Sequence, residues 1–136
     1  MKYFAFVLGL LFIVSCAHVS ETSSNISPLD VDGTWKGVWD SKGKYDLPPK
    51  LLILKLKSDG DTITGTGCDA TADPNKWHEL KNIKRKGNTL YFSSTPQPGL
   101  TLKYDALVEG DFINLTFKWN TQVGVMSENV TLVREK

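Results

Sequence analysis

The sequence is poor in cysteine and histidine, each of which occurs only twice, as Cys16, Cys68, His18 and His78. A structural zinc site needs four closely spaced Cys or His ligands, so these residues do not predict one. Cys68 and His78 could be paired as thiolate and imidazole, but the sequence indicates no third group to orient them. We therefore expect no metal, no cofactor and no catalytic centre.

The chain also lacks an excess of charge of either sign. It has 16 Lys and Arg residues against 15 Asp and Glu residues, which gives a formal net charge of +1. Proteins that bind nucleic acids usually carry a basic stripe. The one basic cluster here, at residues 81–86, runs into a predicted turn. Nucleic acid is therefore not an expected partner, and we expect a monomer.

Long apolar runs are scarce, and the one that exists, Phe4 to Val14, is shorter than a membrane-spanning helix. It follows the basic Lys2 and is typical of an export signal. The run ends at Ile13-Val14-Ser15-Cys16. These four residues resemble the lipobox of bacterial lipoproteins, which implies a signal peptide over residues 1–15 and a lipid on Cys16. An ordinary secretory signal cut after Ala17 is the alternative.

Residues 16–31 predict a flexible tether, because they are rich in Ser and Thr and show no sustained period. The lipoprotein resemblance implies a cell-envelope protein held to a membrane by lipid. If the host is Gram-negative, the resemblance also implies retention in the outer membrane, because Ala17 rather than Asp follows Cys16. A secreted protein is the alternative. If Cys16 carries lipid, Cys68 is the one remaining thiol, and no internal disulfide forms.

Residues 32–136 predict a single all-β domain. Short segments of alternating polarity follow one another, separated by turn residues, as in an antiparallel meander. Eight antiparallel strands in up-and-down order can close into a barrel that has no free edges. The expected strands are residues 33–40, 50–57, 62–68, 78–86, 89–94, 100–109, 112–119 and 128–135.

The connections between these strands alternate in length. Asp59-Gly60, Gly87-Asn88 and Gly110-Asp111 are typical of two-residue hairpin turns, and up-and-down order places all three at one end. The longer connections fall at the opposite end, at residues 41–49, 69–77, 95–99 and 120–127. The barrel should therefore have one pinched end and one open end.

The first and last strands carry a family resemblance. Gly33-Thr34-Trp35, together with Arg134, resembles the G-x-W and terminal Arg signature of lipocalins and fatty-acid-binding proteins, the calycin superfamily. The resemblance implies that Arg134 packs over Trp35 and seals the pinched end, in a structural role. The body also resembles a small lipocalin-like domain of exported bacterial proteins. A lid helix and a C-terminal helix, which members of these families carry, are not indicated here.

Aromatic and apolar residues near the open end are the candidate ligand-binding residues. Two alternatives remain open. A hollow barrel would bind a small apolar or amphiphilic molecule without catalysis, and we favour this reading. A solidly packed barrel would serve as a protein-binding, enzyme-accessory or inhibitor module. The candidates are Trp39, Tyr45, Leu52, Trp77, Phe92, Leu100, Tyr104, Phe117 and Trp119.

Replacing Cys16 by Ser tests the predicted anchor. A Ser at this position cannot form the thioether that holds diacylglycerol, so the Cys16→Ser protein should leave the membrane fraction and become soluble without detergent. Fractionation of the natural host with detection of the protein measures this. A Cys68→Ser variant is the control and should stay in the membrane fraction. An unchanged distribution of Cys16→Ser would contradict lipidation.

Overall fold

The computed structural model describes residues 29–136, and the predicted signal peptide, Cys16 and most of the predicted tether lie outside this range. The described chain is all-β, and within it no helix is long and apolar enough to cross a membrane. Its nine strands are β1 (Gly33–Trp39), β2 (Lys50–Asp59), β3 (Thr62–Asp69), β4 (His78–Glu79), β5 (Lys81–Lys86), β6 (Thr89–Gln97), β7 (Leu100–Glu109), β8 (Phe112–Thr121) and β9 (Gly124–Arg134).

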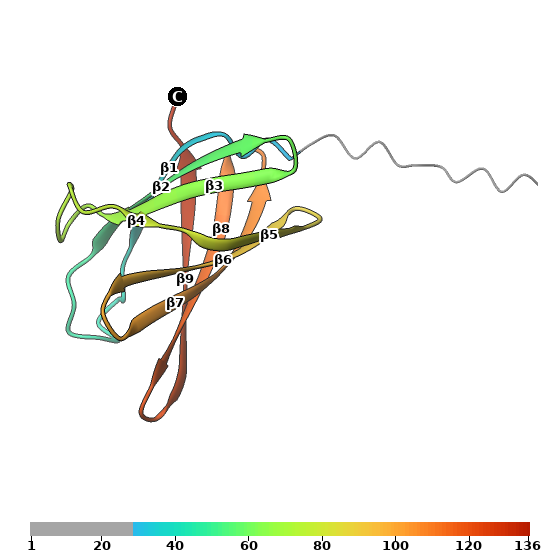
Figure 1. The fold of residues 1–136 in the computed structure, drawn as a ribbon. Helices are drawn as coiled ribbons and strands as arrows, with labels where there is room; N and C mark the ends of the chain where they lie inside the picture. The colour runs from blue at the N-terminus through green and yellow to red at the C-terminus, as the bar shows by residue number, and fades with distance from the viewer. Residues whose placement is uncertain (1–28) are drawn as a thin grey trace, which may run out of the picture.

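The strands form one antiparallel sheet in the order β4-β3-β2-β1-β9-β8-β7-β6-β5. Figure 1 shows this sheet curling into a nearly closed barrel, with the first and last strands side by side. In the seam between them, Trp35 is paired with Arg134 and Lys36 with Val133. The predicted all-β, antiparallel, up-and-down architecture is confirmed, and it is compatible with a lipocalin-like fold.

The prediction of eight strands is wrong by one, because the segment 78–86 breaks at Leu80. Its first part, β4, pairs with β3 through Thr66–Glu79 and Gly67–His78. Its second part, β5, pairs with β6 and contains a bulge between Lys81 and Lys84. Asn82 in that bulge has a φ of 54°, which lies in the left-handed region. Because of this break, one segment pairs first with β3 and then with β6.

The barrel is also not fully closed by hydrogen bonds. β4 and β5 are the two ends of the sheet, and the ladders found in residues 29–136 do not join β3 to β5. The Leu80 N–H donates to the Gly65 carbonyl at 2.9 Å, and this hydrogen bond narrows the gap between β3 and β5. The expectation of a barrel without edges therefore fails here. Lysines along β5 are the usual protection of such an edge.

Three tight turns form the pinched end, as predicted. Gly60, Gly87 and Gly110 open them with φ values of 59°, 61° and 62°, which a side chain would disfavour. The first turn is Gly60-Asp61 rather than Asp59-Gly60, since β2 continues to Asp59. In Figure 1 the β2–β3 and β5–β6 turns lie on the side where the described chain begins.

The open end differs from the expectation in one important respect. Long connections at residues 40–49 and 70–77 are present, but the long loop predicted at 120–127 is not. Instead β8 and β9 continue as a ladder to Thr121 and Gly124, and this hairpin projects from the barrel in Figure 1. The Thr121 hydroxyl donates to the Gly124 carbonyl and closes the turn. Similarly, β6 runs to Gln97 through most of the predicted loop 95–99.

The barrel interior is filled at its pinched half by apolar side chains from nearly every strand. Val31, which the sequence analysis placed in the tether, is fully buried, and its carbonyl accepts a hydrogen bond from the Trp35 indole at 3.0 Å. Leu29 also packs against this core. The ordered body therefore starts before residue 32. The fully buried side chains are Val31, Trp35, Leu90, Val108, Ile113, Leu115 and Leu132.

Trp35 and Arg134 meet at the pinched end. The Arg134 guanidinium carbon lies 4.2 Å from the Trp35 ring centroid, which is cation–π geometry. Arg134 also donates to the Asp30 carbonyl at 2.9 Å and to the Asp32 carbonyl. Its Nε lies 3.1 Å from the Asp111 carboxylate. One side chain therefore ties the entering chain, the β7–β8 turn and the last strand to the buried indole.

Gly37 permits a close approach between β1 and β9. A Cβ on Gly37 would lie 2.3 Å from the Thr131 carbonyl oxygen and 2.7 Å from the Leu132 side chain. The first of these is a backbone atom, which cannot swing away. The alternation of Trp35, Gly37 and Trp39 therefore combines two large buried rings with a position where β9 lies too close to the β1 backbone for a side chain.

Arg134→Ala should lower the free energy of unfolding by about 2 kcal/mol, because it removes the cation–π contact and leaves two carbonyls without their charged donor. Urea denaturation measures this loss. Arg134→Lys should lose less, since an ammonium retains the charge over the indole but not the planar fork. An Arg134→Ala midpoint equal to that of the parent protein would contradict the role of this contact.

Gly37→Ala should destabilise the barrel by about 3 kcal/mol, the upper part of the range for overpacking, because the new methyl group meets backbone. Gly67→Ala is the matched control. Its Cβ would lie 3.2 Å from the Leu54 side chain and 3.8 Å from the nearest backbone oxygen, so a small rotation relieves the contact. Thermal unfolding of the two variants should separate them clearly, and equal losses would argue against a steric limit at Gly37.

Candidate functional site

A cavity of about 460 Å³ lies in the open half of the barrel. Its walls are mostly apolar and aromatic, and a few polar residues stand among them. This size and character are typical of small-molecule pockets. The lining residues from the barrel strands include Trp39, Leu52, Leu54, Leu100, Leu102, Tyr104, Leu115, Phe117 and Trp119.

Aromatic rings from four parts of the chain form a continuous belt around this space. Phe117 is central, with its centroid 5.8 Å from both Trp39 and Trp119 and 6.4 Å from Tyr104. Tyr45, on the loop 40–49, lies 6.3 Å from Trp39 and 6.2 Å from Trp119. These separations are in the range of favourable aromatic pairs. The belt therefore gives the open end a rigid apolar rim.

The structure brings six of the nine sequence-predicted ligand residues to the cavity wall: Trp39, Leu52, Leu100, Tyr104, Phe117 and Trp119. Tyr45 is in the aromatic belt but not in the wall. Phe92 lies behind Tyr104, stacked on it at 4.9 Å.

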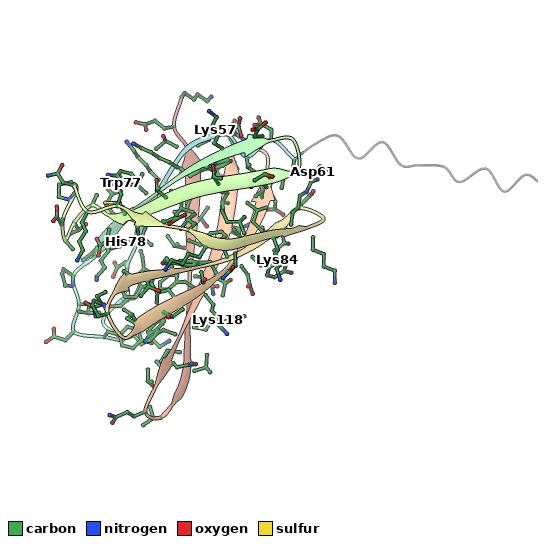
Figure 2. The ribbon with its side chains drawn as sticks, in the orientation of Figure 1. Lys57, Asp61, Trp77, His78, Lys84 and Lys118 are labelled. Carbon is green, nitrogen blue, oxygen red and sulfur yellow. The ribbon has the colours of Figure 1, made fainter. Side chains whose placement is uncertain are left out.

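Trp77 is not brought to the cavity. The Lys55 ammonium lies 4.4 Å from its ring, on the outer side of β2. Figure 2 shows Trp77 and His78 together where the loop 70–77 enters β4. Trp77 is the last residue of the loop 70–77 and not part of a strand, so strand alternation could not place it.

Apart from Tyr104, the polar residues of the wall are not among the predicted site residues. Lys50 and Asp69 form an ion pair of 3.2 Å, and Ser94 and Tyr104 share a hydrogen bond of 2.9 Å. His78 also lines the cavity. Burial raises the pKa of Tyr104, which keeps its hydroxyl protonated and able to donate. Strand alternation could have identified Lys50 as a wall residue, because Lys50 shares the inward side of β2 with Leu52.

A second ion pair lies beside the aromatic belt. Glu128 is the cross-strand partner of Phe117 and shares the inward side of β9 with Val130. The Lys44 ammonium, from the loop 40–49, lies 2.7 Å from its carboxylate and 5.4 Å from the Tyr45 ring centroid. Lys44 lowers the pKa of Glu128, with smaller contributions from Tyr45 and Trp39. The carboxylate therefore remains ionised at pH values below the usual pKa of Glu.

Cys68 is buried, and its thiol contacts the Asp73 carbonyl at 3.3 Å. Parity placed it on the outer side of β3, where the loop 70–77 now covers it. Burial raises the pKa of this thiol, so the unreactive protonated form dominates at neutral pH. His78, on β4, is the cross-strand partner of Gly67, and no hydrogen bond joins it to Cys68 among the described residues.

The described residues contain no group of three or more His, Cys, Asp or Glu side chains that could hold a metal ion. What the arrangement can do chemically is enclose an apolar group and place an ionic or hydroxyl group at its edge. No family model, no curated protein and no solved structure matches the chain. The function is therefore argued from the geometry of the cavity.

Proposed function

We propose that the protein binds a small apolar or amphiphilic molecule in the open half of its barrel, without catalysing a reaction on it. The observation that supports this is the cavity of about 460 Å³, lined mainly by aliphatic and aromatic residues. A barrel of this strand number either fills with side chains or encloses one small ligand. The pinched half is filled, whereas space remains between Leu52, Leu102 and Phe117.

The cavity volume limits the size of the ligand. A water molecule takes a share of about 30 Å³, so the cavity has room for roughly 15 atoms of that size. This suits one alkyl chain of medium length or one small ring system. Several polar groups at the wall, including Lys50, Asp69 and the Ser94–Tyr104 pair, favour an amphiphile over a pure hydrocarbon.

The setting that we propose is a lipid-anchored protein of the bacterial cell envelope with a lipocalin-like barrel. The lipobox-like Cys16 and the Trp35–Arg134 signature support it. Arg134 ties Asp30 and Asp32 to the pinched end, so the described chain enters there. A barrel tethered through that end would present its open end away from the anchoring membrane.

A second candidate function, binding of another protein, is favoured by the projecting β8–β9 hairpin. Val123 at its tip is 92% exposed, and Val125, two residues further along the chain, is 67% exposed, so this hairpin presents two apolar side chains to solvent. The hairpin and the cavity are at the same end of the barrel, so a partner at the tip would lie near any ligand. The enzyme-accessory and inhibitor readings belong to this second candidate.

Leu102→Trp should abolish ligand binding by filling the cavity, because Leu102 lines it on β7. Titration of the parent protein with 1-decanol, below its solubility limit, should change the emission of Trp39 and Trp119 in a saturable way. Isothermal titration calorimetry should give one site per chain. We expect Leu102→Trp to weaken this binding at least about tenfold, which is 1.4 kcal/mol.

Leu107→Trp is the matched control. Leu107 is on the same strand but on the outer side, where it is 39% exposed. The same enlargement there should leave decanol binding unchanged, and circular dichroism verifies that both variants remain folded. The proposal fails if the parent protein shows no saturable binding, or if the two variants bind decanol equally well.

A further inference from the structure

In both ion pairs of the open end, the carboxylate side chain is less exposed to solvent than the lysine side chain. The Glu128 side chain is 15% exposed whereas that of Lys44 is 56% exposed, and for Asp69 and Lys50 the values are 26% and 34%. The backbone N–H groups of Thr71 and Ala72 donate to the Asp69 carboxylate and fix it. In both pairs the carboxylate is therefore the less exposed partner, and the positive charge is at the end of a long lysine side chain.

Aromatic groups surround the Glu128 carboxylate. The Trp39 indole N–H and the Tyr45 hydroxyl lie beside it and help to lower its pKa. Both atoms are buried, and neither makes a hydrogen bond of normal geometry within the described part of the chain. Trp39, only 6% exposed, also lines the cavity. A carboxylate beside an aromatic ring is an arrangement by which proteins bind organic cations.

The protein already places one cation in this position. The Lys44 ammonium lies between the Glu128 carboxylate and the face of Tyr45. Lys44 comes from an irregular loop and is more than half exposed, so this ion pair is easily exchanged. An anionic group here would meet the Glu128 carboxylate, which would repel it.

We propose that the ligand of the barrel is a cationic amphiphile, with its apolar part in the cavity and its ammonium group beside Glu128 and the rings of Trp39, Tyr45 and Trp119. This inference rests on the proposed function, because it assigns a headgroup to the molecule in the same cavity. Lys44 acts as an internal competitor that neutralises Glu128 when the site is empty and moves into solvent when the ligand binds.

The test compares three probes of equal chain length below their critical micelle concentrations: decyltrimethylammonium, 1-decanol and decyl sulfate. Titration calorimetry and tryptophan emission measure the affinity of each. Decyltrimethylammonium should bind about tenfold more tightly than decanol, and decyl sulfate should bind more weakly than decanol. Tenfold is within the range expected for a partly desolvated cation–π and ionic contact.

Two variants identify the headgroup site. Glu128→Gln should reduce the affinity for decyltrimethylammonium about tenfold and leave decanol binding unchanged. Lys44→Ala should raise the affinity for decyltrimethylammonium about threefold, because the competing cation is gone. An increase in affinity on removal of a lysine is not expected from a merely structural role.

The matched controls are Asp105→Asn and Lys118→Ala, which break an ion pair of 3.0 Å outside the cavity, on β7 and β8. Figure 2 labels Lys118, below the centre of the barrel. Neither control should change the affinity of any probe.

Equal binding of the three probes would overturn the inference while leaving the proposed function in place. So would a loss of decyltrimethylammonium affinity in Lys44→Ala. Binding of none of the probes would remove the proposed function, and the inference with it. Decanol binding by Glu128→Gln shows that this variant is folded, and if it fails to fold, the Lys44→Ala result alone decides.

Discussion

The packing of Arg134 over the buried Trp35 ring is the contact on which the barrel depends. It joins the first strand to the last, although nearly one hundred residues separate them in the chain. The seam has only two paired residues on each strand, so hydrogen bonding across it is meagre. Side-chain packing must therefore supply the stabilisation that these few hydrogen bonds between β1 and β9 do not provide. Gly37 extends the same seam, because the missing side chain lets β9 lie directly against β1.

This seam also determines which end of the barrel can hold a ligand. The entering chain, the three tight turns and the Trp35 ring occupy the same end and fill it. Interior space is left at the other end, where the strands are joined by the loops 40–49 and 70–77 and by the longest hairpin. The cavity is thus a consequence of asymmetric connection lengths, and Phe117 and Trp119 are in its wall because β8 runs into that hairpin.

Much of this could be predicted from alternation and turn chemistry alone. Trp35 and Trp39 were expected inside, and both are buried, because alternation is a local property of an extended chain. The break at Leu80 could not be foreseen, since it depends on two different neighbours, β3 and β6, competing for one segment. The β8–β9 hairpin was missed because Gln122 and Val123 do not form a standard turn pair. Lys50 has the inward parity of Leu52, but a lysine at the start of a strand does not by itself indicate a site residue.

Inward charges at the open end are difficult to explain by stability. A pair such as Lys44 and Glu128 gains little where it is exposed, and a carboxylate among aromatic rings loses hydration that the pair must restore. The chain nevertheless keeps the Lys50–Asp69 ion pair in the cavity wall and the Lys44–Glu128 ion pair beside the aromatic belt. This combination supports the proposed binding of an amphiphile, because a charged group at the edge of an apolar cavity would fix how far the apolar part of the ligand can enter.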